Sequence, residues 1–261
     1  MELLFIGDIV GKPGRDCIKA VLPDLIDTYD IDFVIANGEN VTHGKGLSKE
    51  HMVELLENGV DVITLGNHAF AKKDIVNYID DYDEVIRPYN LHSVFPGKGT
   101  NVYEIYDKKI RVTNLLGRVY MGNNVENPFD SLKHIVEKEE KCDIHIVDFH
   151  AEATGEKLSL AWAFDGLVTA ILGTHTHVPT NDARLLSNGT AYQSDVGMCG
   201  PYNGILGSKR EGVINRTWTG YPSVFEVQIE KEVIFCATLI SIDNHTNKVT
   251  KIQPIQQILE L

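Results

Sequence analysis

Eight side chains that could bind a metal ion or move a proton each follow a short apolar segment of this 261-residue sequence. They are two carboxylates, two amides and four imidazoles, namely Asp8, Glu39, Asn40, Asn67, His68, His150, His175 and His177. So large a mixed set of oxygen and nitrogen donors exceeds the needs of one ion. It suits two borderline metals such as Fe, Mn or Zn, whereas Mg or Ca would want oxygen-only shells. Because only two carboxylates are available, Glu39 is the expected bridging ligand.

Each of these residues, taken alone, has an ordinary structural explanation. Asp8 could cap a helix, and the Asn37–Asn40 segment could be a simple turn. A His-x-His pair such as His175 and His177 is often incidental, although in an extended segment both rings would point to one side. What indicates a site is that all eight residues follow predicted strands in a single chain.

The segments before these residues are predicted strands. Five apolar runs end in glycine or in a polar cluster: Leu3–Ile6, Phe33–Ala36, Val62–Leu65, Ile144–Val147 and Val168–Leu172. Ligands in open α/β sheets bind beyond the carboxyl ends of strands, so the eight side chains are expected to meet there. Helical patterns fill the gaps, at Arg15–Tyr29 (where Pro23 should kink or shorten the helix), Glu50–Glu57, Lys72–Ile79 and Pro128–Glu139.

The alternation of strands and helices predicts an α/β fold. Two stretches, Asn101–Leu115 and Ser223–Ile242, alternate in polarity without a helix, as in antiparallel hairpins. We therefore expect a sandwich of two mixed sheets with helices outside. The sequence has no internal repeat and no Pro/Ser-rich linker, which indicates a single domain over residues 1–261.

Composition excludes several classes of protein. With 43% hydrophobic residues the chain can form a core, and with 24 Lys and Arg against 37 Asp and Glu its net charge of −13 disfavours binding to extended nucleic acid. No apolar run is long enough to cross a membrane, and the first residues do not resemble a secretion signal. The four scattered cysteines fit a reducing compartment, so a cytoplasmic location is expected.

The motifs around these residues resemble the ordered blocks of calcineurin-like metallophosphoesterases. The blocks are Gly7-Asp8, Gly38-Glu39-Asn40, Gly66-Asn67-His68, His150 and Gly173-x-His175-x-His177. The fit is closer to the bacterial YmdB-like phosphodiesterases, with which the chain shares Phe5–Gly11, Asn37–Asn40, His43–Leu47, Asp148–Thr154, Gly173–Val178 and Asp195–Tyr202. This resemblance implies a calcineurin-like four-layer αββα sandwich.

The resemblance also implies a division of the ligands. One metal would be held by Asp8, Glu39, Asn40 and His177, and the other by Glu39, Asn67, His150 and His175. Val10 stands where the wider superfamily has a histidine, and Asn40 is expected to supply the missing ligand. His68 would be the proton donor and not a ligand.

The implied activity is hydrolysis of 2′,3′-cyclic nucleotides at the 2′ bond, giving 3′-nucleotides, or of similar small phosphodiesters. Two divalent ions would outweigh the charges of Asp8 and Glu39, so an acidic protein would still hold a cationic pocket. A hydroxide bridging the metals would attack the phosphorus, and His68 would protonate the leaving oxygen. There are two alternatives: a phosphomonoesterase or 5′-nucleotidase on the same centre, and a nucleotide-binding regulatory protein of low turnover. The sequence leaves open whether the chain forms a homo-oligomer.

Four further residues have weaker assignments. Lys45 and Arg118 lie in glycine-containing loops and could contact a substrate phosphate, although surface charge explains them equally well. Glu152 and Asp195 could orient the metal-binding histidines through hydrogen bonds, in competition with a capping role.

Overall fold

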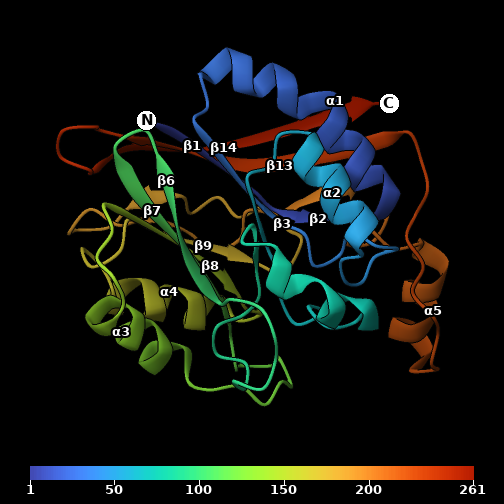
Figure 1. Ribbon diagram of the computed structural model, residues 1–261. Helices are drawn as coiled ribbons and strands as arrows, with labels where there is room; N and C mark the ends of the chain where they lie inside the picture. The colour runs from blue at the N-terminus through green and yellow to red at the C-terminus, as the bar shows by residue number, and fades with distance from the viewer.

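Two mixed β-sheets packed face to face form the centre of the computed structural model, which describes residues 1–261 (Figure 1). The first sheet has the strand order β2-β12-β13-β1-β3-β4-β5, with β14 added beside β13. Its strands are β1 (Glu2–Ile6), β2 (Asp8–Ile9), β3 (Phe33–Asn37), β4 (Val62–Thr64), β5 (Val85–Ile86), β12 (Met198–Pro201), β13 (Glu232–Ile242) and β14 (Val249–Glu260).

The second sheet has the order β10-β11-β9-β8-β7-β6. Its strands are β6 (Thr100–Ile105), β7 (Lys108–Leu116), β8 (Ile144–His150), β9 (Ala170–Thr174), β10 (Arg184–Leu185) and β11 (Ala191–Gln193). In each sheet the central strands are parallel: β1, β3, β4 and β5 in the first, and β7, β8, β9 and β11 in the second. All these strands therefore present their carboxyl ends at one edge of their sheet.

The helices cover the outer faces of the two sheets. Leu4 and Ile6 of β1 pack with residues of α1 (Gly11–Tyr29) and α2 (Lys49–Glu57) on one side. On the other side, Val147 and Phe149 of β8 pack with α3 (Pro128–Lys138) and α4 (Thr154–Ala163). Figure 1 shows α1 and α2 on the opposite side of the sheets from α3 and α4. The predicted four-layer αββα sandwich is confirmed.

A third apolar cluster fills the space between the sheets. Alternate residues of the first sheet, such as Leu3 and Phe5, meet alternate residues of the second, such as Ile144 and Ile146. Strand side chains point alternately to opposite faces, so each central strand contributes to two apolar layers. This double burial explains why these strands are continuous apolar runs in the sequence.

Several predicted elements differ from those observed. The expected helix at Lys72–Ile79 is replaced by two short 3₁₀ helices, η1 (Lys73–Asn77) and η2 (Ile79–Asp81). The tighter 3₁₀ turn places Ile75 and Tyr78, three residues apart, on the same buried side. The first helix runs without a break from Gly11 to Tyr29, because Pro23 lies on its exposed side, where water can satisfy the carbonyl that lacks an N–H partner.

The two predicted hairpins have different outcomes. Asn101–Leu115 does form the hairpin of β6 and β7. In Ser223–Ile242 only β13 is a long strand. It forms a hairpin with the following strand β14, and it also pairs antiparallel with β1 and β12. Neither α4 nor α5 (Arg210–Thr219) is predicted from the sequence. No residue of α5 is buried, and the helix lies at the right-hand edge of Figure 1, apart from the layers. No helix has the length and apolarity needed to cross a membrane.

Candidate metal centre

The eight predicted site residues converge at the carboxyl ends of the parallel strands. Asp8 begins β2 just after β1, Glu39 and Asn40 follow β3, and Asn67 and His68 follow β4. From the second sheet, His150 ends β8, and His175 and His177 follow β9. The first sheet thus supplies all the carboxylates and amides, while the second supplies three of the four imidazoles.

One cluster of donors joins Asp8, Glu39, Asn40 and His177. Nε2 of His177 lies 3.1 Å from Nδ2 of Asn40 and 3.6 Å from Oδ1 of Asp8. Nδ2 of Asn40 also lies 3.2 Å from Oε1 of Glu39. These are the four residues that the sequence analysis expected around the first metal.

A second cluster joins Glu39, Asn67, His150 and His175. Nε2 of His150 lies 3.0 Å from Oδ1 of Asn67, 3.0 Å from Nδ1 of His175 and 3.2 Å from Oε1 of Glu39. Glu39, His150 and His175 each offer a donor atom within 4.8 Å of the others, a spacing that could hold a metal ion. Glu39 is common to both clusters, and this mixed oxygen and nitrogen chemistry fits a transition metal.

Gly66 allows these donors to approach one another. A methyl group at this position would overlap both the carboxylate of Glu39 and the ring of His150. The glycine of the Gly66-Asn67-His68 motif therefore has a steric role: it leaves the space that the second cluster occupies.

His68 lies beside the clusters and reaches solvent. Its Nδ1 is 3.1 Å from Oδ1 of Asn40 and 3.3 Å from Oε1 of Glu39, and its backbone N–H donates to Oε2 of Glu39 over 2.8 Å. Its side chain is 29% exposed, whereas that of Glu39 is almost fully buried. His68 is thus placed between the candidate metal ligands and the open cavity.

The loop that carries His175 and His177 is not extended. The φ angles of the two residues are 101° and 65°, in the left-handed region that non-glycine residues rarely adopt. The two rings consequently diverge, His175 toward His150 and His177 toward Asp8. The expectation that both rings point to one side of an extended segment was wrong, and the divergence is what lets one motif contribute to both clusters.

The burial of charged groups in these clusters shifts their pKa values. Burial would raise the pKa of Asp8 and Glu39, but the facing histidines outweigh it and the net shift is downward for both carboxyls. Burial would lower the pKa of His150, yet Glu39 and Asp8 raise it to about 9. Burial and the neighbouring His150 lower the pKa of His175 to about 4.

A hydrogen-bonded chain that the sequence analysis missed supports His150. Its Nδ1 lies 2.9 Å from Oγ1 of Thr174, and Thr174 donates to Oδ1 of Asp148 over 2.6 Å. Asp148 also accepts from Thr64 (2.5 Å) and from Asn37 (2.9 Å). Asp148 and Thr174 lie in the motif blocks, two residues before His150 and one before His175, and this proximity is the signal that could have identified them.

A buried ion pair supports the His175–His177 loop. Nζ of Lys157 donates to Oδ2 of Asp195 (2.9 Å) and to the carbonyl of Thr174 (2.8 Å), and both charged side chains are almost fully buried. The same Asp195 oxygen accepts the backbone N–H of Thr176 over 3.0 Å. Asp195 therefore acts on the backbone of the loop. Lys157, in an otherwise ordinary helix, gave no sequence signal.

A cavity of about 600 Å³ opens in front of the two clusters. Lys45 and Lys72 contribute to its lining, as do the apolar side chains of Leu206, Phe225 and Val227. Glu152 also lines it, and Oε2 of Glu152 lies 3.2 Å from Nε2 of His175, as expected for an orienting partner. Arg118 is not part of this lining.

Comparison with known proteins gives this arrangement a family. The sequence model of the YmdB-like protein family matches residues 4–255. The chain belongs to this family. It is 45% identical over 256 residues to the 2′,3′-cyclic-nucleotide 2′-phosphodiesterase of Bacillus subtilis, covering 98% of this chain and 96% of that protein.

Two solved structures superpose on nearly the whole of this chain and cover most of their own length. A phosphatase from Mycoplasma pneumoniae does so with a TM-score of 0.94 and 42% identity, over 100% of this chain and 94% of its own. A Thermus thermophilus protein gives 0.93 and 40% identity, over 99% of both chains. The NAD nucleotidase of Haemophilus influenzae, at 12% identity and a TM-score of 0.57 over 99% of this chain and 56% of its own, shares the fold alone. The chain is a hydrolase, as the sequence predicts.

Proposed function

We propose that this YmdB-like chain is a metal-dependent phosphodiesterase, acting as one domain, that opens 2′,3′-cyclic nucleotides at the 2′ bond to give 3′-nucleotides. The observation that carries the proposal is the pair of donor clusters sharing Glu39 beneath a solvent-accessible cavity. The Bacillus subtilis relative, named for this reaction, matches nearly the whole chain. The same site would also hydrolyse similar small phosphodiesters.

Two metal ions, Fe or Mn with Zn as the alternative, would occupy the clusters. Asp8, Glu39, Asn40 and His177 would hold one, and Glu39, Asn67, His150 and His175 the other. The metals would supply Lewis acidity that activates water and neutralises charge on the phosphoryl oxygens. Asn40 would coordinate through Oδ1. In the structure its Nδ2 faces His177, so coordination requires a half-turn of the amide, which exchanges two atoms of nearly equal size.

His68 would protonate the leaving 2′ oxygen. Its position between Asn40 and the open cavity, with its ring partly exposed, supports this role because a general acid must reach both the reacting group and solvent protons. The apolar wall formed by Leu206, Phe225 and Val227 offers a surface for the nucleobase, and Lys45 and Lys72 add local positive charge that attracts an anionic substrate.

The decisive experiment compares His68→Ala with the unaltered enzyme on two substrates. Loss of general acid catalysis should reduce turnover of a 2′,3′-cyclic nucleotide by roughly 10²–10⁴-fold. The loss should be much smaller on bis-p-nitrophenyl phosphate, whose leaving group needs no proton. Elemental analysis should find two metals per chain in both proteins. Equal losses on both substrates, or loss of metal from the variant, would exclude this role for His68.

Metal content also tests the ligand assignment. Asn40→Ala should lower occupancy of one site and spare the other, because only the first cluster includes Asn40. Equal loss from both sites, or no loss, would contradict the division of ligands.

A phosphomonoesterase activity is the second candidate, because the fold is shared with a nucleotidase. Comparing bis-p-nitrophenyl phosphate with p-nitrophenyl phosphate separates the two activities. The proposed phosphodiesterase should prefer the diester, and a clear preference for the monoester would favour the alternative.

A further inference from the structure

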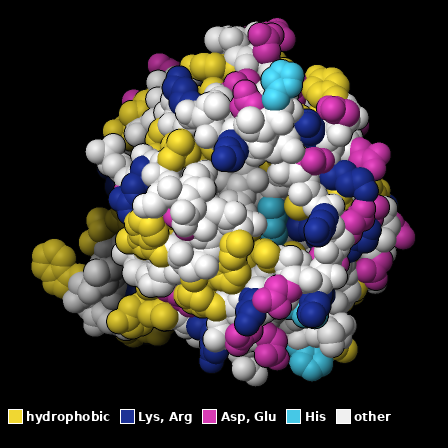
Figure 2. Space-filling view, turned by 90° about the vertical axis from the view of Figure 1, so that its left-hand side faces the viewer, with side chains coloured by type: hydrophobic (Ala, Val, Ile, Leu, Met, Phe, Trp, Pro, Cys, Tyr) yellow, Lys and Arg dark blue, Asp and Glu magenta, His cyan; other side chains and the backbone are white.

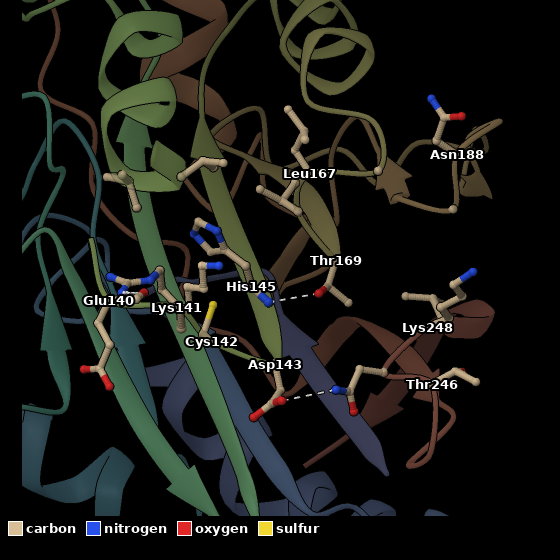
Figure 3. A pocket seen from close by; sticks show the side chains of 18 residues that line it. Glu140, Lys141, Cys142, Asp143, His145, Leu167, Thr169, Asn188, Thr246 and Lys248 are labelled. Atoms are coloured by element: carbon tan, nitrogen blue, oxygen red, sulfur yellow. Dashed lines mark hydrogen bonds between the residues drawn. The ribbon is translucent and has the colours of Figure 1, made fainter. Parts of the chain in front are cut away.

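A second cavity of about 470 Å³ lies at the amino ends of β7, β8 and β9, at the opposite end of these strands from the candidate metal centre. It is bordered by the segment before β8, by Leu167–Thr169 before β9, and by the turn between β13 and β14 (Figure 3). Its volume is within the range of about 300–1,000 Å³ that is common for small-molecule sites. Neither the sequence motifs nor the comparisons assign a role to it.

Two polar residues occupy core-facing positions at this end of the second sheet. Arg111 of β7 and His145 of β8 are paired across neighbouring strands. Both side chains point to the face of the sheet that α3 and α4 cover, the same face as Val147 of β8. Both are buried, at 3% and 6% exposure. Nε2 of His145 lies 2.9 Å from Oγ1 of Thr113, so its polar ring is satisfied within the sheet. The charge of Arg111 calls for a further explanation.

The guanidinium of Arg111 is buried without a carboxylate partner. It donates to Oγ1 of Thr100 (3.2 Å) and to the carbonyl of Glu140 (2.6 Å), and no acidic oxygen lies within 4.0 Å of it. The two carboxylates of the lining are engaged elsewhere. Glu140 pairs with Lys109, and Asp143 accepts from the backbone N–H of Lys109 and from Asn247, the latter bond being drawn in Figure 3. A buried charge is normally paired directly, and this one is not. The carboxyl of Glu140 has its pKa lowered mainly by Lys109 and only to a smaller extent, at longer range, by Arg111.

Further positive charge borders the cavity. Lys141 and Lys248 are exposed lining residues, and neither forms an ion pair. Figure 2 shows a hollow in this face with a histidine at its floor and Lys or Arg side chains beside it. Burial and Arg111 lower the pKa of His145 to about 3, so its ring is neutral and adds no charge.

We propose that this cavity binds a small organic phosphate whose phosphate group is held by Arg111, Lys141 and Lys248. None of these three cations forms an ion pair with a carboxylate, so their positive charge is available to a phosphate dianion. Guanidinium groups bind phosphate oxygens in a directed, bidentate way. Leu167 and Val168 give the organic part an apolar surface. The buried Oδ1 of Asn247, which has no hydrogen-bond partner, can accept from a ligand hydroxyl or amine.

The test observes the ring of His145 by NMR in zinc-loaded protein that contains ¹³C-labelled histidine, because zinc, unlike Fe or Mn, does not broaden the signals. Inorganic phosphate is the probe, added at constant ionic strength against sodium chloride. Phosphate should shift the His145 signals saturably and chloride should not. His145 is five residues from His150 along β8, or about 16 Å at roughly 3.3 Å per residue, so phosphate at the metal centre should leave these signals unchanged.

Variants decide whether the shift reports the proposed site. The double variant Lys141→Gln, Lys248→Gln should bind the phosphate at least about tenfold more weakly, since two charge-assisted contacts are removed. Arg111→Gln should abolish the saturable shift. Lys19→Gln, an exposed lysine on α1, is the matched control and should behave as the unaltered protein.

An absent or non-saturating shift, or an unchanged affinity in the double lysine variant, would overturn the proposal. If Arg111→Gln does not fold, the lysine pair and its control still decide the question. The readout is phosphate binding and not phosphodiesterase activity. The phosphate site can therefore be disproved while the proposed function stands, and the proposed function can be disproved while the phosphate site stands.

Discussion

Nδ1 of His150 lies 2.9 Å from Oγ1 of Thr174, and this contact determines which nitrogen of the ring can bind a metal. The hydroxyl of Thr174 donates its proton to Asp148, so its oxygen can only accept from the Nδ1–H of His150. The ring therefore turns its Nε2 toward Glu39 and Asn67. Such outer partners orient metal ligands and raise their basicity.

Thr174→Val should weaken metal binding at the second cluster by roughly 10–100-fold, the usual effect of losing an orienting hydrogen bond to a histidine ligand. Metal titration with elemental analysis measures the effect. Thr64→Val is the matched control: it removes a bond to the same Asp148 but has no contact with His150. Equal effects of the two substitutions would contradict the role given to Thr174.

Gly66→Ala should impair metal binding without unfolding the protein. The added methyl group would overlap the Glu39 carboxylate and the His150 ring, pushing two donors of the second cluster apart. Gly155→Ala in α4 is the control, because its methyl group would meet nothing within 4 Å. We expect lost metal and activity in the first variant only. Retention of metal by Gly66→Ala would show that the cluster tolerates expansion.

Lys157→Met should destabilise the protein by about 3–5 kcal/mol, because it leaves the buried Asp195 carboxylate without its cation. Urea denaturation measures this loss. The His175–His177 loop should also become more mobile, since Asp195 holds the N–H of Thr176. Hydrogen exchange of that amide is the second measurement. A loss below 1 kcal/mol with unchanged exchange would mean that the pair does not hold the loop.

His145 should make the protein less stable in acid. Its pKa in the folded state is about 3, lowered by burial and by Arg111, whereas an unfolded histidine titrates near 6.5. The unfolded state therefore takes up a proton first, and the stability present above pH 6.5 is lost as the pH falls toward 3.

Between pH 7.5 and pH 5.0 the titration of His145 should lower the free energy of unfolding by about 2 kcal/mol. The loss is about 1.4 kcal/mol per pH unit below 6.5. His145→Gln, which can keep a bond to Thr113, should lose that much less stability than the unaltered protein over the same interval. Urea denaturation at the two pH values provides the comparison. Identical pH dependence in both proteins would show that His145 titrates normally.

The sequence predicted the elements that carry strong local signals. Strands buried on both faces appear as apolar runs, and their ends marked all eight candidate residues. The same reasoning missed α5, because a helix with no buried residue has no apolar periodicity to detect. The predicted hairpin within Ser223–Ile242 was also wrong, since β13 forms its hairpin with β14, beyond a turn at Asp243–Asn247.

Long-range contacts account for what was missed within the site. The left-handed backbone of His175 and His177 is not a local preference of histidine. It is imposed by Asp8, which accepts the N–H of His175 over 3.0 Å, and by Asp195, which accepts that of Thr176. Both carboxylates are far from the loop in sequence, at separations of 167 and 19 residues.

The division of donors between the sheets has a mechanical consequence. The proposed oxygen ligands come from the first sheet and all three proposed nitrogen ligands from the second, so a bound metal would link the two sheets. Sliding of one layer over the other by a fraction of an ångström would separate carboxylate from imidazole. A ligand that binds only the folded state stabilises it, and here that stabilisation would act specifically against shear between the two halves of the sandwich.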